Sequence, residues 1–290
     1  MRWQSGRRSD NVEDRRGISV GRGGATLGCG GLILVLAIAL ITGRDPREIL
    51  QLVEQTQGPS TSVQQPAPGT PAQPRPDDQL ADFVSVVLAD TEDTWTPIFK
   101  SMGRTYTPPT LVLFTDAVES ACGYSSAATG PFYCPGDSKL YIDLGFYGEL
   151  RDRFGAPGDF AQAYVVAHEI GHHVQNELGI SDKVHQLEQQ SSEREANAIS
   201  VKLELQADCF AGVWANHADS QRKMLEEGDV EEGLNAAAAI GDDRLQRMAG
   251  RSVSPDTWTH GSSEQRVQWF RTGMQSGDMR DCDTFGSSRR

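Results

Sequence analysis

The chain has 290 residues, of which 38% are hydrophobic, and its formal net charge is −13. A chain of this length can form one substantial hydrophobic core or two small ones. The charge is unevenly distributed, because residues 1–44 carry +4 whereas residues 45–290 carry −17. A surface with this much negative charge repels phosphate backbones, which argues against nucleic acid as a partner.

The beginning of the chain predicts a membrane anchor. Residues 1–24 are rich in Arg and Gly with few apolar side chains, so we predict an unfolded cytoplasmic tail. Residues 25–43 carry no charge and have an apolar centre, and six arginines precede them. Because positive residues stay on the cytoplasmic side, we predict a single-pass cell-membrane protein whose main domain is extracytoplasmic. A cleaved signal peptide is the alternative, because the most apolar part spans only ten residues.

A proline-rich stretch separates this anchor from the main domain. Residues 44–78 contain seven prolines among Gln, Thr, Ser and Gly, which predicts a disordered linker. The folded domain is predicted over residues 79–290. Apolar residues recur at helical spacing from Leu80 towards Trp95 and predict an amphipathic helix. Two runs typical of β-strands follow, at residues 110–114 and 140–144.

The cysteines of this domain predict two disulfides. Cys122 and Cys134 flank a Gly/Ser-rich loop between the two predicted strands, so we pair them, which leaves Cys209 to pair with Cys282. Disulfides fit the oxidising environment outside the cytoplasm. Four free buried thiols are the alternative.

Later segments are predicted to be helical. The first well-signalled helix has Asp159 and Gln162 as a capping-box pair and Gly179 as its stop. After a polar connection, a second capping box at residues 192–195 opens another helix. Two more helices are predicted, over residues 230–248 and 264–274. Helices around a small strand region indicate a mostly helical α+β domain.

The helix that begins near Asp159 contains the sequence His168-Glu-Ile-Gly-His172. Residues four apart share one helix face, so the two imidazoles can bind one Zn²⁺ at about 2.0–2.1 Å. Glu169 is rotated by about 100° from His168 and can act as the general base towards a zinc-activated water. Gly171 costs about 1 kcal/mol within a helix, which suggests that another element approaches closely there. The alternative is two ordinary surface histidines that flank a glutamate.

A catalytic zinc site needs a third protein ligand. Gln175 and Leu178 stand where the three-histidine metzincin pattern has Gly and His, which excludes that pattern. Glu204 and Asp208 lie one turn apart beside the apolar stripe of the second helix. We predict that Glu204 completes a His₂Glu site and that Asp208 accepts the free ring N–H of a ligand histidine. Two glutamates in the first turn of that helix are rival ligands, although their position suits helix capping: Glu193 and Glu195.

Peptide hydrolysis at such a site also needs a hydrogen-bond donor to the developing oxyanion. His260 stands just before the predicted helix at residues 264–274. We predict that His260 is this donor, with a structural hydrogen bond at the helix start as the alternative.

These motifs resemble the neutral zinc metallopeptidase family, which comprises membrane-anchored bacterial proteins of the zincin class. The resemblance covers nearly the whole chain, from the Arg-rich start through four motifs, at residues 168–175, 203–212, 240–243 and 259–261. It implies a zincin-like α+β fold preceded by one transmembrane helix, and one zinc ion in a gluzincin-like arrangement. The matching positions are His168, His172 and Glu204 for the metal and Glu169 for catalysis.

The resemblance also implies a mode of substrate binding. Leu140 to Leu144 would be the edge strand that pairs with an extended substrate, whose backbone supplies the hydrogen bonds.

The predicted function is therefore that of a membrane-anchored zinc metalloendopeptidase acting on proteins or peptides. A catalytically silent zinc-binding scaffold is the main alternative, and a zinc amidase acting on a non-peptide amide is a third. Structural zinc sites usually close all four positions, often with Cys, whereas this sequence offers three evident ligands and a glutamate base, which favours catalysis. The sequence predicts no oligomeric state.

Overall fold

The structure, a computed structural model, describes residues 1–17, 78–127 and 130–286. The anchor predicted at residues 25–43 and the linker up to residue 77 lie outside the described residues. Within the described part of the chain, no helix combines the length and the apolar character that a membrane crossing requires.

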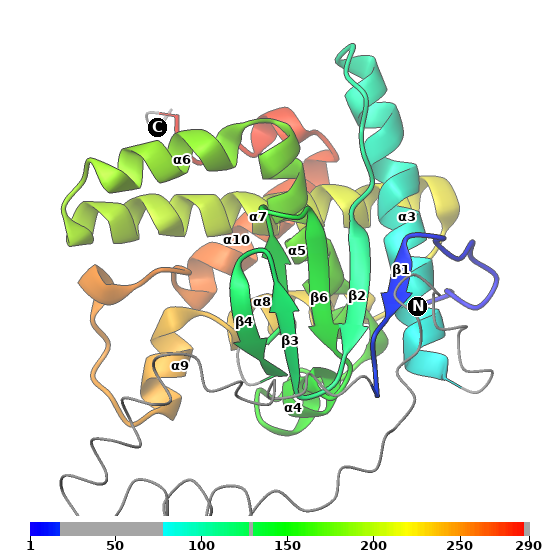
Figure 1. Cartoon of the computed structure of the whole chain (residues 1–290), viewed down its shortest axis with the longest axis horizontal. Helices are drawn as coiled ribbons and strands as arrows, with labels where there is room; N and C mark the ends of the chain where they lie inside the picture. The colour runs from blue at the N-terminus through cyan, green and yellow to red at the C-terminus, as the bar shows by residue number, and fades with distance from the viewer. Residues whose placement is uncertain (18–77, 128–129, 287–290) are drawn as a thin grey trace, which may run out of the picture. The chain divides into compact units, whose positions relative to one another are not determined.

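A four-stranded mixed sheet forms the strand region, and Figure 1 shows three of its strands side by side. In spatial order its strands are β1 (Val12–Asp14), β2 (Thr110–Phe114), β6 (Lys139–Asp143) and β5 (Phe132–Cys134). β1, β2 and β6 run parallel, whereas β5 pairs antiparallel with β6. The strand predicted at 110–114 is confirmed, and β6 begins one residue before the prediction. The expectation that residues 140–144 form an edge strand is wrong, because β6 has a partner on each side and β5 is at the edge.

A separate β-hairpin fills much of the predicted loop between β2 and β6. It consists of β3 (Ala117–Ser120) and β4 (Gly123–Ser126), which pair antiparallel. Cys122 at its turn forms a disulfide with Cys134 of β5, with 5.8 Å between their Cα atoms. The predicted pairing is therefore confirmed, and it ties the hairpin to the edge strand.

Helices supply most of the core. They are α3 (Gln79–Ser101), α4 (Phe146–Asp152), α5 (Asp159–Glu177), α6 (Ile180–Gln189), α7 (Glu193–Arg222), α8 (Asp229–Ala239), α9 (Asp242–Met248) and α10 (Ser263–Ser276), with 3₁₀ turns η2 (Pro255–Thr257) and η3 (Met279–Asp281). α5 is central, because it contacts α3, α7 and α8. The predicted α+β, mostly helical class is confirmed.

The ends of the helices follow the predictions in part. Gly179, with a φ of 70°, follows α5 as its stop, and the capping box of Ser192 and Glu195 opens α7. Asp159 does not cap α5, however. Its carboxylate accepts hydrogen bonds of 3.0 Å from the α-ammonium of Met1 instead. α6 occupies the predicted polar connection, and Gly241 divides the helix predicted at 230–248 into α8 and α9.

α10 packs closely on α7, and glycine makes this possible. A Cβ atom at Gly273 would lie 1.9 Å from the carbonyl oxygen of Cys209, so a larger residue would push the two helices apart. Beyond α10, Cys282 returns to Cys209 and forms the second predicted disulfide, with 5.6 Å between the Cα atoms. Closing a loop with a sequence separation of 73 stabilises the folded chain by about 4 kcal/mol through chain entropy.

Residues 1–17 are folded against the domain. β1 pairs with β2, with Val12 opposite Leu111, and the Trp3 ring packs edge-on against Phe83 at 5.4 Å between centroids. The expectation that residues 1–24 contain too few apolar side chains to fold is therefore wrong for residues 1–17. The physical reason is that the domain supplies the missing partners, namely a strand edge and acidic side chains.

Candidate metal centre

The candidate site lies where α5 and α7 cross. A Cβ atom at Gly171 would lie 2.8 Å from the carbonyl oxygen of Ala207 and 2.9 Å from its Cα atom. Only glycine allows the two backbones to approach so closely, which meets the expectation drawn from Gly171. The crossing directs the histidine face of α5 towards α7.

The three predicted ligands converge on one point. The Nε2 atom of His168 lies 3.3 Å from one carboxylate oxygen of Glu204, and the Nε2 atom of His172 lies 3.4 Å from the other. The two imidazole centroids are 4.9 Å apart and their planes are nearly perpendicular. One ligand atom from each residue lies within 4.8 Å of the other two.

This cluster fits a zinc ion. Two imidazole nitrogens and a carboxylate oxygen are among the donors that zinc binds in proteins. Tetrahedral ligands at about 2.0–2.1 Å from a metal lie about 3.3 Å from one another. The two histidine nitrogens lie 3.3 and 3.4 Å from the two oxygens of Glu204, which is close to that spacing.

The electrostatics of the cluster favour a cation. Burial alone would raise the pKa of Glu204, but His172 and His168 outweigh burial and lower this pKa well below its usual range. Burial alone would lower the pKa of His168, but Asp208 and Glu204 outweigh burial and raise it to about 10. Without a metal, the ionised carboxylates therefore favour a protonated His168, and a cation bound between the ligands would take the place of the proton on Nε2.

Asp208 lies where the sequence places it, behind His168. Its carboxylate oxygen is 2.9 Å from Nδ1 of His168. Because an ionised carboxylate only accepts, Nδ1 of His168 carries the proton and Nε2 is left to bind a metal.

Gln175 performs the same task for His172 and was not predicted to do so. Its side-chain nitrogen donates to the carbonyl oxygen of Leu203 at 2.7 Å, which turns its amide oxygen towards Nδ1 of His172, at 2.9 Å. His172 therefore also presents Nε2 to the metal position. The sequence does contain a signal for this contact. Gln175 follows His172 by three positions, which places the two side chains beside each other on one helix face.

Arg266 completes the polar layer behind the site and was also missed. It donates from Nε and Nη2 to the two oxygens of Asp208, at 2.8 and 2.9 Å, and only 1% of its surface is exposed. The Tyr164 hydroxyl hydrogen-bonds the same carboxylate. Burial raises the pKa of Asp208, but Arg266 and His168 outweigh burial and lower it. Asp208 is therefore an ionised, fully paired group that joins α5, α7 and α10.

Glu169 lies between the ligands and the edge of the sheet. Burial raises the pKa of its carboxyl group, against the opposing effects of His172 and His168. The backbone of Tyr133, on β5, also opposes burial and lowers this pKa, and α5 contacts β5. β5 therefore passes directly beside Glu169.

A buried hydrogen-bond network holds β5 in that position. The Tyr133 hydroxyl lies 3.1 Å from Nδ1 of His173 and accepts from the Asn176 amide at 3.1 Å. Nε2 of His173 donates to the carbonyl oxygen of Thr107 at 2.8 Å, so Nδ1 is the atom that accepts from the tyrosine. His173 is therefore a packing residue, and only 1% of its surface is exposed.

Replacing Tyr133 with Phe removes one hydroxyl from this network. We expect a loss of about 1–3 kcal/mol in the free energy of unfolding, because His173 and Asn176 each lose a partner in a largely buried setting. Urea denaturation measures this change. Tyr124→Phe is the control, since that side chain is 70% exposed, and equal effects of the two substitutions would contradict the network.

His260 lies in the loop before α10, and Asp242 shapes that loop. One oxygen of Asp242 accepts the backbone N–H groups of Thr259, His260 and Gly261, at 2.9, 2.6 and 3.0 Å. The other lies 3.2 Å from Nδ1 of His260. This contact with Asp242 raises the pKa of His260, and burial opposes it. Nε2 of His260 has no hydrogen-bond partner within the described residues, and the side chain is 49% exposed.

The rival ligands do not take part in the cluster. Glu195 accepts a hydrogen bond of 3.0 Å from the backbone N–H of Ser192 as a helix cap, and Glu193 is exposed. Neither belongs to the groups of potential metal ligands within the described part of the chain.

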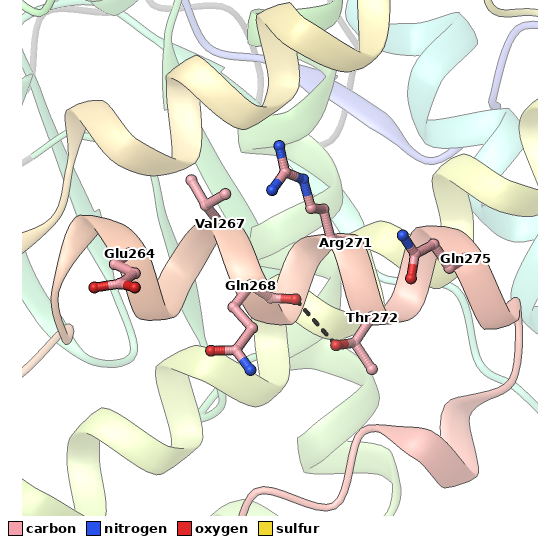
Figure 2. A pocket seen from close by; sticks show the side chains of 6 residues that line it. All are labelled: Glu264, Val267, Gln268, Arg271, Thr272 and Gln275. Carbon is pink, nitrogen blue, oxygen red and sulfur yellow. Dashed lines mark hydrogen bonds between the residues drawn. The ribbon is translucent and has the colours of Figure 1, made fainter.

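Two other surface features do not coincide with this site. A second acidic cluster, of Asp159, Asp229 and Glu232, surrounds the α-ammonium of Met1. A depression along α10 is lined by side chains from that helix alone, as Figure 2 shows: Glu264, Val267, Gln268, Arg271, Thr272 and Gln275. None of these residues was predicted to belong to the site.

Replacing Glu204 with Gln tests the ligand assignment. We expect zinc content to fall from one ion per chain to near zero, because a neutral amide is a much weaker zinc donor than a carboxylate. Metal analysis after dialysis against a weak chelator measures this. Glu193→Gln serves as the control and should retain zinc, and stoichiometric zinc in Glu204→Gln would remove Glu204 from the ligand set.

The fold and this cluster define a mixed α+β protein with a candidate metal centre of two histidines and a glutamate. The chain belongs to the family described as "Putative neutral zinc metallopeptidase", whose profile matches residues 1–285, as the motifs predicted. It is 50% identical over 294 residues to "Uncharacterized protein YpfJ" of Escherichia coli K12, covering 99% of this chain and 100% of that protein. It is 40% identical over 261 residues to "Uncharacterized protein Rv2575" of Mycobacterium tuberculosis H37Rv, covering 86% of each. No solved structure matches the chain.

Proposed function

We propose that this protein is a zinc-dependent endopeptidase of zincin-like, gluzincin-like architecture that hydrolyses peptide bonds in proteins or peptides. The observation that carries the proposal is the convergence of His168, His172 and Glu204 on one point with Glu169 beside them. No fourth Cys, His, Asp or Glu joins this group within the described residues. Structural zinc sites usually have four protein ligands, so a set of three favours catalysis over a scaffold role.

The described residues suggest how the reaction proceeds. His168, His172 and Glu204 would hold one zinc ion, which when bound polarises a carbonyl oxygen and makes water more acidic. Glu169 accepts the proton of the attacking water and passes it to the leaving amine. Asp208 and Gln175 keep both imidazoles in the tautomer that presents Nε2. His260, through its free Nε2, donates a hydrogen bond to the developing oxyanion.

The edge strand offers a place for the substrate. An extended peptide can add to an exposed sheet edge through backbone hydrogen bonds. β5 is an edge of the described sheet and contacts α5, the helix that carries Glu169. We therefore propose residues 132–134, in place of 140–144, as the strand that pairs with the substrate.

We also propose that the domain acts outside the cytoplasm at the cell membrane. Two disulfides join Cys122 to Cys134 and Cys209 to Cys282, and such bonds persist in oxidising compartments. The uncharged segment at residues 25–43 would provide the attachment.

Metal analysis combined with digestion of a peptide library tests the proposed function. We expect the purified full-length chain to hold one zinc ion and to cleave peptides, to lose activity with a chelator and to regain it with zinc. Bound zinc without cleavage of any peptide would favour the scaffold. Hydrolysis of non-peptide amides alone would favour the amidase.

Replacing His260 with Ala tests the oxyanion donor. We expect kcat to fall by about 10²–10³-fold with zinc content unchanged, the usual cost of losing one such donor. Because Asp242 raises the pKa of His260, the donating imidazolium is populated below that pKa and activity declines as pH rises through it. Asp242→Asn should therefore shift the alkaline limb of the pH–kcat profile to lower pH. Full activity of His260→Ala would leave this histidine a structural role only.

A further inference from the structure

We infer that residues 1–17 and residues 78–286 lie on the same side of the membrane, so the N-terminal segment is part of the extracytoplasmic domain rather than a cytoplasmic tail. This inference is independent of the proposed enzymatic activity, because it concerns where the chain folds and not what it catalyses.

The first observation is that residues 11–15 complete the sheet. The backbone N–H of Leu111 donates to the carbonyl oxygen of Asn11, and the N–H of Arg15 donates to the carbonyl oxygen of Leu113, both at 2.8 Å. The side chains of Leu111 and Leu113 are almost fully buried. Without β1, strand β2 would be an unpaired apolar edge, which soluble domains avoid.

The second observation concerns Glu92 on α3. This residue is only 6% exposed. Its carboxylate accepts from Arg7 at 2.8 Å, from the Ser9 hydroxyl at 2.5 Å and from the Asn11 amide at 2.9 Å. All three donors come from the N-terminal segment, so a buried acid of the domain relies on residues 1–17 for its hydrogen bonds.

The third observation concerns the arginines on which the cytoplasmic prediction rested. Arg8 pairs with Asp82 at 2.6 Å, and Arg7 pairs with Asp93 as well as with Glu92 at 2.8 Å. These acids all belong to α3. Single exposed ion pairs contribute little, but several that agree with a strand pairing specify one docked arrangement. The positive charge of Arg7 and Arg8 is therefore balanced by the domain itself, which weakens the reason to assign the segment to the cytoplasm.

The fourth observation is that the first described range ends close to the point where the second begins. Arg16 forms an ion pair with Asp78, the first described residue after the gap. A single membrane crossing between residues 17 and 78 would put these two partners on opposite sides. The predicted topology, one crossing with a cytoplasmic N-terminus, is therefore incompatible with the folded domain.

A zero-length carbodiimide cross-link tests the inference in membranes that contain the full-length chain. Glu13 lies 2.8 Å from the amino group of Lys139 on β6, so we expect an amide-linked peptide that joins the two residues. Lys139→Arg keeps the charge but cannot form this amide, and it should abolish the linked peptide. Absence of the link in membranes from the unaltered chain would overturn the inference.

Thiol labelling in intact cells gives a second, independent test. Ser5→Cys and Ser220→Cys each introduce one exposed thiol, in a Cys29→Ser background so that no other free cysteine reacts. We expect a membrane-impermeant maleimide to label both positions to the same extent before permeabilisation. Labelling of position 220 in intact cells, with position 5 labelled only after permeabilisation, would restore the single-crossing topology.

Discussion

Replacing Glu169 with Gln is expected to lower kcat by about 10²–10⁴-fold, the usual contribution of a general base. The amide has almost the same shape as the carboxylate, but it cannot take up a proton. Zinc content and thermal stability should therefore stay unchanged. A fluorogenic peptide assay, with metal analysis on the same preparation, measures both quantities.

A matched control distinguishes this effect from a general loss of acidic charge. Glu177→Gln changes a carboxylate at the end of the same helix, α5, and should leave kcat unaltered. Activity of Glu169→Gln equal to that of the unaltered enzyme would exclude Glu169 as the base. Loss of zinc in Glu169→Gln would point to a role in metal binding instead.

Replacing Arg266 with Met is expected to destabilise the protein by about 3–5 kcal/mol, the cost of leaving a buried charge without its partner. Asp208 is the stranded group, because it is fully buried and takes two hydrogen bonds from Arg266. Since Asp208 also orients His168, zinc affinity should fall by about 10–100-fold. Urea denaturation in a chelating buffer and competition with a zinc indicator measure the two effects.

Two further variants separate the ion pair from the rest of α10. Arg271→Met alters an exposed arginine on the same helix and should change neither stability nor zinc affinity. The double variant Arg266→Met with Asp208→Asn removes both charges, so it should lose less stability than the two single variants added together. A strictly additive loss would show that the two groups do not depend on each other.

The parts of the site that the sequence predicts are those in which spacing along one helix determines geometry. His168, Glu169 and His172 need only the pitch of α5, and Asp208 follows from Glu204 by one turn of α7. Gly171 predicts only that another element approaches α5, and the place of Glu204 beside the apolar stripe makes it the candidate third ligand. The structure brings Glu204 to both histidines.

The missed features depend on contacts between distant segments. Arg266 meets Asp208 across 58 positions of sequence, and Asp242 meets His260 across 18, and no periodicity indicates either pair. The N-terminal segment was misjudged for the same reason. Its composition was assessed alone, whereas the acids that hold it, such as Glu92, lie on α3 beyond the linker.

The contact between Gly171 and Ala207 has a consequence for metal affinity. Because the main chains of α5 and α7 touch there, the span between the ligands is set by two rigid helices and not by flexible side chains. Gln175, Asp208 and Arg266 lock the remaining rotations through buried hydrogen bonds. Binding an ion therefore orders very little of the protein, so most of the free energy of coordination contributes to the affinity for the ion.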